Sequence, residues 1–95
     1  MKVIKLKNKD YITGYNAGFS LGQQKAQQLT NKLKALKLSN PDLAFTWLKQ
    51  IKEENKKAEK VIQTLKTEGK TASFIEGWKE GYQKAFIDEY NKIST

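Results

Sequence analysis

The sequence contains no cysteine, no histidine and no arginine, and each absence excludes a kind of chemistry. Without cysteine there is neither a disulfide framework nor a thiolate metal site. Without histidine the chain lacks the commonest metal ligand and the one side chain that titrates near neutrality when unperturbed. Without arginine it lacks the planar fork that binds guanine or phosphate through two hydrogen bonds. We therefore expect no metal site, no cofactor and no base-specific recognition of nucleic acid.

Long apolar runs are absent as well. No stretch approaches the ~18 consecutive apolar residues of a transmembrane helix, and residues 1–9 lack the apolar segment of a signal peptide. We expect a cytoplasmic protein that does not contact a membrane. The 95 residues suffice for one small domain whose core is too modest to hold a small-molecule substrate. We assign residues 1–9 to a basic N-terminal arm and residues 10–95 to a single helical domain.

Candidates for catalysis are few. Glu76 and Glu80 lie four residues apart, on one face of a helix, as a two-carboxylate site would require. Lys79 and Lys84 lie close to them in the sequence, so we interpret these carboxylates as solvent-exposed groups rather than acid catalysts. No serine has a histidine to activate it. The sequence therefore predicts no catalytic residue and a protein that is not an enzyme.

Glycine and aromatic residues are concentrated in two matching stretches, Tyr11–Gly22 and Phe74–Ala85. The aligned pairs are Tyr11/Phe74, Gly14/Gly77, Tyr15/Trp78, Gly18/Gly81, Phe19/Tyr82 and Gly22/Ala85. A spacing of four residues forms a row along one face of an α-helix. Each glycine inside a helix costs about 1 kcal/mol relative to alanine. We therefore expect a second helix to approach these rows closely and offset the cost; the alternative is a flexible glycine-rich loop.

The chain as a whole predicts an all-α fold with helices over about residues 10–38, 41–68 and 73–93. Asp10 is a candidate N-cap, Ser39-Asn40-Pro41 separates the first two helices, Gly69 ends the second, and Ser73–Glu76 has the pattern of a capping box. Steps of three and four residues identify the side chains that should face the core. They are Ile12, Tyr15, Phe19, Gly22, Ala26, Leu29, Leu33 and Leu36, then Ala44, Trp47, Leu48, Ile51, Ala58, Val61, Ile62 and Leu65, then Phe74, Ile75, Trp78, Tyr82, Ala85, Phe86 and Ile93.

Two arrangements fit this pattern, a three-helix up-down-up bundle and an extended helical hairpin. In the bundle the first and third helices are parallel, so the two glycine rows face each other inside one chain. In the extended form the same rows meet across a homodimer. The candidate residues for helix packing or for binding a protein partner are Tyr11, Gly14, Tyr15, Gly18, Phe19, Gly22, Phe74, Gly77, Trp78, Gly81 and Tyr82.

The motif formed by Gly14-Tyr15-x2-Gly18-Phe19 and by Gly77-Trp78-x2-Gly81-Tyr82 resembles the glycine-repeat helices in the regulator of the flagellar export ATPase. The resemblance covers about a quarter of the chain. It implies assembly of helix on helix, and it implies nothing about export.

The positive charge is uneven. All eighteen cations are lysine, the formal net charge is +8, and residues 1–40 hold eight lysines against one acid. Such point charges can hold a polyanion without reading its sequence; the alternative is that lysine abundance reflects the composition of the source genome. The candidate polyanion contacts are Lys2, Lys5, Lys7, Lys9, Lys32, Lys34 and Lys37.

The leading hypothesis is a small non-catalytic interaction protein that binds a protein partner or itself through the glycine/aromatic helix faces. The alternative is a sequence-nonspecific accessory protein that binds nucleic acid with its lysine-rich N-terminal portion.

Overall fold

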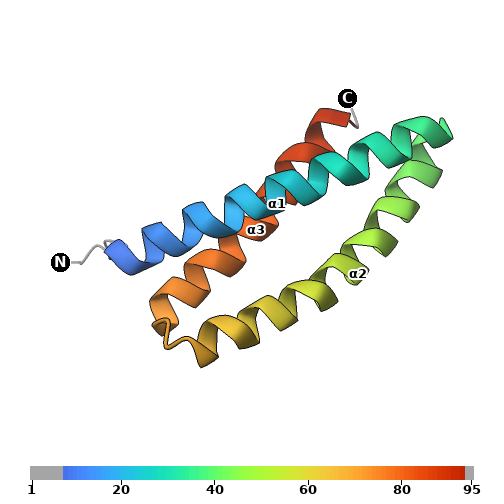
Figure 1. Cartoon of the computed structure of the whole chain (residues 1–95). Coiled ribbons are helices and arrows are strands. Elements are labelled where there is room, and N and C mark those ends of the chain that lie inside the picture. The colour runs from blue at the N-terminus through green and yellow to red at the C-terminus, as the bar shows by residue number, and fades with distance from the viewer. Residues whose placement is uncertain (1–7, 94–95) are drawn as a thin grey trace.

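A computed structural model describes residues 8–93, which form three helices joined by short turns, α1 (Lys9–Leu36), α2 (Asn40–Thr67) and α3 (Ala72–Ile93). The described residues contain no strand, so the all-α prediction is confirmed. α1 and α3 run in the same direction, and α2 runs back in the opposite one (Figure 1). Most of the expected basic arm lies outside the described residues, and Lys9 is already the first residue of α1.

The cap of α1 differs from the expected one. Asn8, rather than Asp10, occupies the N-cap, and its side-chain oxygen accepts a hydrogen bond from the Tyr11 backbone N at 2.8 Å. Asp10 lies in the first turn instead, where its carboxylate accepts a hydrogen bond from Thr71 Oγ1 at 2.9 Å. The start of α1 is therefore bonded to the turn that precedes α3.

The start of α3 is also capped two residues earlier than the sequence pattern indicates. Thr71 Oγ1 accepts a hydrogen bond from the Phe74 backbone N at 3.1 Å, which satisfies a free donor of the first turn. Ser73, the expected first member of a capping box, accepts instead from Asn8 Nδ2 at 3.0 Å. Side chains from both helix starts thus fix α1 and α3 at the same level.

Two residues with positive φ turn the chain between helices. α1 ends at Leu36 because Lys37 adopts a left-handed conformation with φ 53°. After α2, Gly69 has φ 82°, a conformation that glycine adopts without a steric penalty.

The three helices do not pack equally. The backbones of α1 and α3 lie close together, whereas α2 stays further from both. Large side chains fill the space beside α2, since the Trp47 ring centroid lies 6.2 Å from that of Phe86 and 5.4 Å from that of Tyr90. The core that results is the cluster Ala26, Leu29, Leu33, Trp47, Ala58, Trp78, Tyr82 and Phe86.

The buried row of α1 differs from the predicted one. Ile12 and Leu36 are 50% and 56% exposed, and Tyr15 and Phe19 are only half-buried. Contact between the α1 and α3 backbones needs a row without side chains, so the aromatic residues beside the glycines are displaced to the flank. The buried residues are Gly14, Gly18, Gly22, Ala26, Leu29, Thr30 and Leu33. On α2 the expected core residue Leu48 is likewise exposed.

Candidate interaction surfaces

The five glycines of the two matching stretches lie where α1 and α3 touch. A Cβ added at any of them would overlap the backbone of the facing helix. The pairs, each a glycine with the carbonyl oxygen that covers it, are Gly14 with Phe74, Gly18 with Trp78, Gly22 with Tyr82, Gly77 with Tyr11 and Gly81 with Tyr15. Because these contacts form within one chain, a partner could reach the glycines only if α1 and α3 separated.

The overlap is smaller at one end of the contact. A Cβ on Gly22 would lie 2.8 Å from the Tyr82 carbonyl oxygen and 2.9 Å from the Ala85 Cβ. Ala85 is the residue of the second stretch that aligns with Gly22, and its methyl group keeps the two helices slightly further apart at this level. The closest approach is thus confined to the N-terminal part of the contact.

The aromatic residues of the two stretches have different exposures. Trp78 and Tyr82 are buried and stack at 5.0 Å between ring centroids, with 12° between their planes. Tyr15 and Phe19 are half-buried and stack at 6.2 Å and 8°. Of the aromatic residues predicted to bind a partner, those on α3 therefore belong mainly to the core, and those on α1 remain partly exposed to solvent.

Two tyrosine hydroxyls are held in the neutral form. Tyr11 Oη donates a hydrogen bond to the Glu80 carboxylate, which raises the pKa of Tyr11 to about 12. Burial, together with the nearby charge of Glu54, raises the pKa of Tyr82 to about 12. Neither group can act as a base near neutrality, in keeping with their packing roles.

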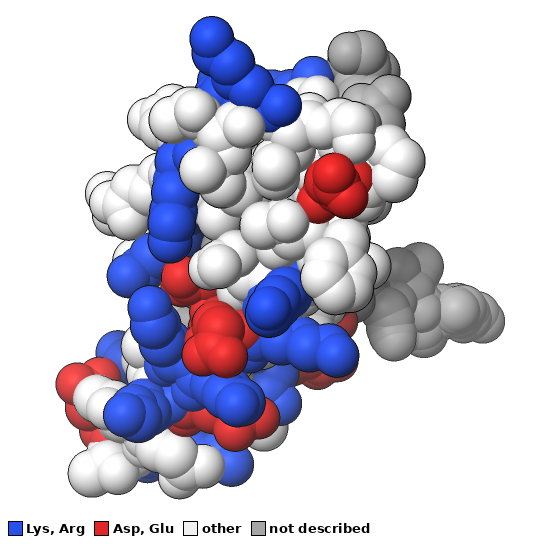
Figure 2. Space-filling view, turned by 90° about the vertical axis from the view of Figure 1, so that its right-hand side faces the viewer, with Lys and Arg blue, Asp and Glu red and all other residues white. Residues whose placement is uncertain are grey.

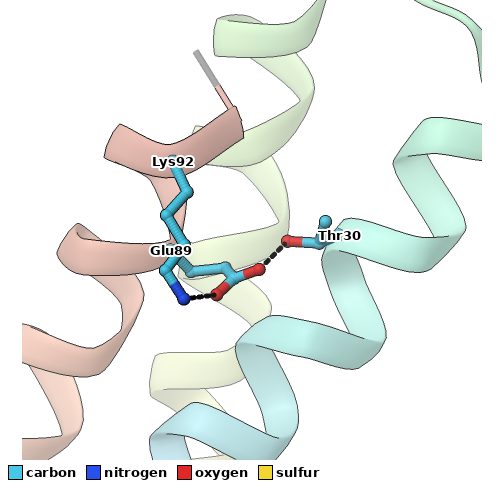
Figure 3. A network of polar contacts seen from close by, with 3 residues as sticks. All are labelled: Thr30, Glu89 and Lys92. Atoms are coloured by element: carbon cyan, nitrogen blue, oxygen red, sulfur yellow. Dashed lines mark hydrogen bonds and ion pairs between the residues drawn. The ribbon is translucent and has the colours of Figure 1, made fainter. Parts of the chain in front are cut away.

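A buried polar contact joins α1 to α3 at the other end of the bundle (Figure 3). Thr30 Oγ1 donates a hydrogen bond to Glu89 Oε2 at 3.0 Å, and Lys92 Nζ lies 3.7 Å from Glu89 Oε1. Glu89 is 8% exposed and Thr30 4%. The carboxylate thus receives a hydroxyl donor on one oxygen and a positive charge on the other, as a buried acid requires.

An exposed apolar surface, which sequence reasoning did not identify, lies between α2 and α3, where Leu48 and Ile87 are 62% and 55% exposed. Phe45, 68% exposed, lies one turn before Leu48 on α2. Leu48 and Ile87 stand on opposite sides of a groove, hereafter the α2–α3 groove, lined among others by Ala44, Leu48, Ile51, Phe86, Ile87 and Tyr90. Phe45 and Ile87 are large apolar residues outside the rows predicted to face the core. Large apolar side chains left over in this way could have indicated an exposed apolar surface from the sequence.

Charge is distributed unevenly over the face of the molecule drawn in Figure 2. Figure 2 shows mostly uncharged side chains over the upper part of one face and interspersed lysines and acids over the lower part. The sequence of α2 has the same division, because the apolar residues Phe45, Trp47 and Leu48 precede the charged run 52–60.

The lysines proposed to bind a polyanion do not form one patch in the part of the chain that the structure describes. Lys9 starts α1, whereas Lys32 and Lys34 lie near its end. Lys9 and Lys32 are about 35 Å apart at a rise of 1.5 Å per residue. Lys32 and Lys34 are two residues apart and so do not face the same side of the helix. Lys2, Lys5 and Lys7 lie outside the described residues.

Between residues 8 and 93 no group of three or more acids is placed to hold a metal ion. No helix in that range is long and apolar enough to cross a membrane. No protein-family model, curated protein or solved structure matches the chain.

Proposed function

We propose that this protein is a small non-catalytic helical interaction protein, and that its partner binds over the α2–α3 groove. The observation that carries the proposal is the exposure of Leu48 and Ile87, which line a mostly apolar groove, together with that of Phe45, one turn before Leu48 on α2. A grouped set of large exposed apolar side chains is characteristic of surfaces that bind another molecule. The glycines support the proposal indirectly, because they make the α1–α3 pair a compact scaffold that leaves α2 free to present this surface.

The partner surface then lies away from the glycine rows. Each glycine is covered by the facing helix, so the rows have no area left to offer. The half-buried side chains of Tyr15 and Phe19 keep a role in binding only at the rim of the α1–α3 contact.

The test is site-specific photo-cross-linking in cells that express the protein. A benzophenone side chain at position 48 or 87 should give a discrete adduct, and the same group at the exposed α1 positions Asn16 or Ser20 should not. Sedimentation of the purified protein then tells a partner from a second copy. If adducts are equally frequent at all four positions, or absent at 48 and 87, the groove is not the binding surface.

Binding of nucleic acid through the lysine-rich N-terminal portion is a second proposal, supported by the eight lysines against one acid in residues 1–40. It predicts affinity for single- or double-stranded DNA or RNA that falls steeply between about 50 and 200 mM salt. Fluorescence anisotropy measures this directly. Replacement of Lys5, Lys7 and Lys9 by glutamine should weaken the binding, and unchanged binding would exclude the arm.

A further inference from the structure

A cavity of about 450 Å³ lies where the ends of α1 and α3 meet the start of α2. Small-molecule sites in proteins are usually clefts of roughly 300–1,000 Å³, so this space suits a small ligand. Among the described residues it shares no lining side chain with the α2–α3 groove. The sequence predicted a core too modest to hold a small-molecule substrate, and this cavity lies at the end of the bundle, beside the core.

Three lysines line the cavity from two helices. Lys34 and Lys37 belong to the end of α1, and Lys92 belongs to the last turn of α3. Lys34 and Lys37 are exposed, and the ion pairs found within residues 8–93 involve neither of them. Only the parallel packing of α1 and α3 brings Lys92 to the same cavity, so the sequence pattern did not group these three residues.

One acid, Glu89, lines the cavity with the lysines. It is 8% exposed, and its carboxylate accepts a hydrogen bond from Thr30 Oγ1 at 3.0 Å and lies 3.7 Å from Lys92 Nζ (Figure 3). Three lysines against this one acid leave the lining with two positive charges in excess.

Charges just outside the lining do not reverse this balance. Asp42, in the first turn of α2, does not line the cavity and accepts a hydrogen bond from Ser39 Oγ at 3.2 Å. Asp88 pairs with Lys84 at 2.9 Å. The C-terminal ends of α1 and α3 each carry about half a negative charge, and the start of α2 carries about half a positive one. The cavity therefore stays positive even when Asp42 and the helix ends are counted in full.

The remaining lining is apolar. Leu33 is 2% exposed, and Leu38, Leu43 and Ile93 are half-buried. A ligand that carried only a charge would leave this apolar wall unused. A purely apolar ligand would remove water from the lysines without replacing its hydrogen bonds. The lining is therefore complementary to a molecule that has both parts.

We infer that this cavity binds a small amphipathic anion, a carboxylate or phosphate group on a short apolar chain. The anionic group lies among Lys34, Lys37 and Lys92, and the chain lies against Leu38 and Leu43. The site is separate from the α2–α3 groove, so the inference goes beyond the proposed function.

The probes are octanoate and octyl phosphate, with octan-1-ol as the uncharged control and acetate as the control without a chain. Binding to the full chain is followed by nitrogen-15 NMR at about 50 and 200 mM salt. Octanoate and octyl phosphate should bind saturably, shift the amide resonances of Leu33, Leu43 and Ile93, and bind more weakly at the higher salt. Octan-1-ol and acetate should each bind at least tenfold more weakly than octanoate.

Protein variants locate the anionic group. Lys34→Gln with Lys37→Gln should weaken octanoate binding about tenfold, because two attractive charges are lost. Lys32→Gln with Lys49→Gln changes the net charge equally at exposed lysines that do not line the cavity, and should have a smaller effect. All four side chains are exposed, so circular dichroism should show an unchanged fold.

Each contrary outcome overturns a stated part of the inference. Octan-1-ol binding as tightly as octanoate would exclude the anionic group, and acetate binding as tightly would exclude the apolar chain. Equal weakening by the two pairs of substitutions would mean that only the overall charge attracts the probe. Octanoate shifts at Leu48 and Ile87 instead would place the probe in the α2–α3 groove. Absence of saturable binding by octanoate and octyl phosphate would overturn the inference alone, because cross-linking from positions 48 and 87 does not involve this cavity.

Discussion

Replacing Gly18 by alanine tests whether the glycines of α1 and α3 are required for close packing. The substitution should raise stability if Gly18 is an ordinary helical residue and lower it if the facing backbone leaves no room for a Cβ. If Gly18 were an ordinary exposed helical residue, Gly18→Ala would stabilise the protein by about 1 kcal/mol through helix propensity. In the structure, however, the new Cβ would overlap the Trp78 carbonyl oxygen and lie 2.8 Å from the carbonyl carbon. Backbone atoms cannot rotate away, so α1 and α3 must separate over several turns.

The magnitude follows from these two terms. Overpacking a tight contact costs about 1–3 kcal/mol, and a rigid backbone obstacle places Gly18→Ala at the upper end of that range. After subtraction of the propensity gain, we expect a net loss of about 2 kcal/mol, or a fall in Tm of roughly 8–16 °C for a domain of this size. Gly81→Ala should behave in the same way, because its Cβ would overlap the Tyr15 carbonyl oxygen. Gly22→Ala, where the overlap is smaller, should cost less.

The assay is thermal and urea unfolding followed by circular dichroism. Ser20, an exposed residue of the same helix, supplies the control, since comparing Ser20→Gly with Ser20→Ala measures the propensity difference without the contact. Gly18→Leu and Gly81→Leu should abolish folding. An increase in Tm on Gly18→Ala, similar to the gain from glycine to alanine at position 20, would refute the close-packing argument.

Three further predictions concern the polar groups. Thr30→Val should lower the free energy of unfolding by about 1–3 kcal/mol in urea, because the buried Glu89 carboxylate loses its hydroxyl donor; no change would mean that water reaches Glu89. Above pH 10 the wild-type protein should lose roughly 1.4 kcal/mol of stability per pH unit relative to Tyr82→Phe, up to about pH 12. The sign follows because the folded state keeps the Tyr82 proton after the unfolded state, with a pKa of about 10, has lost it; parallel pH profiles would contradict this. Thr71→Ala should lower Tm through loss of about 1 kcal/mol at the cap that receives the Phe74 backbone N–H, whereas Thr71→Ser should restore it.

The sequence by itself determined the helices and their boundaries to within two residues. Periodic apolar residues, a single proline after Ser39-Asn40 and a glycine after residue 67 are local signals, and helix formation depends largely on local interactions. The caps of α1 and α3 were each displaced by two positions, because Asn8, Asp10, Thr71 and Ser73 all have side chains suited to capping. All four side chains also bond across the two helix starts, Asn8 to Ser73 and Thr71 to Asp10, and no local pattern shows these pairings.

Only the tertiary structure decided which surface each helix buries. Apolar periodicity counted Ile12, Leu36 and Leu48 as core residues, but the backbone contact at the glycines rotated α1 so that Ile12 faces solvent. Glu89 was not among the residues predicted to face the core, yet it is buried, and Thr30 on α1 supplies its hydrogen-bond donor. A hydrogen bond between residues 59 positions apart leaves no local pattern.

The location of the glycine contact also depends on the tertiary structure. A row of glycines predicts that something approaches closely, yet it does not say whether that helix belongs to the same chain or to another. The answer depends on the short turns and on α2, which runs back so that α3 lies parallel to α1. The glycine rows of α1 and α3 then cover each other within one chain. Because Trp47 and its neighbours hold α2 away from α3, a groove with exposed Leu48 and Ile87 remains between them. The sequence therefore determined that the helices assemble, and the three-dimensional packing decided which of their faces remain exposed.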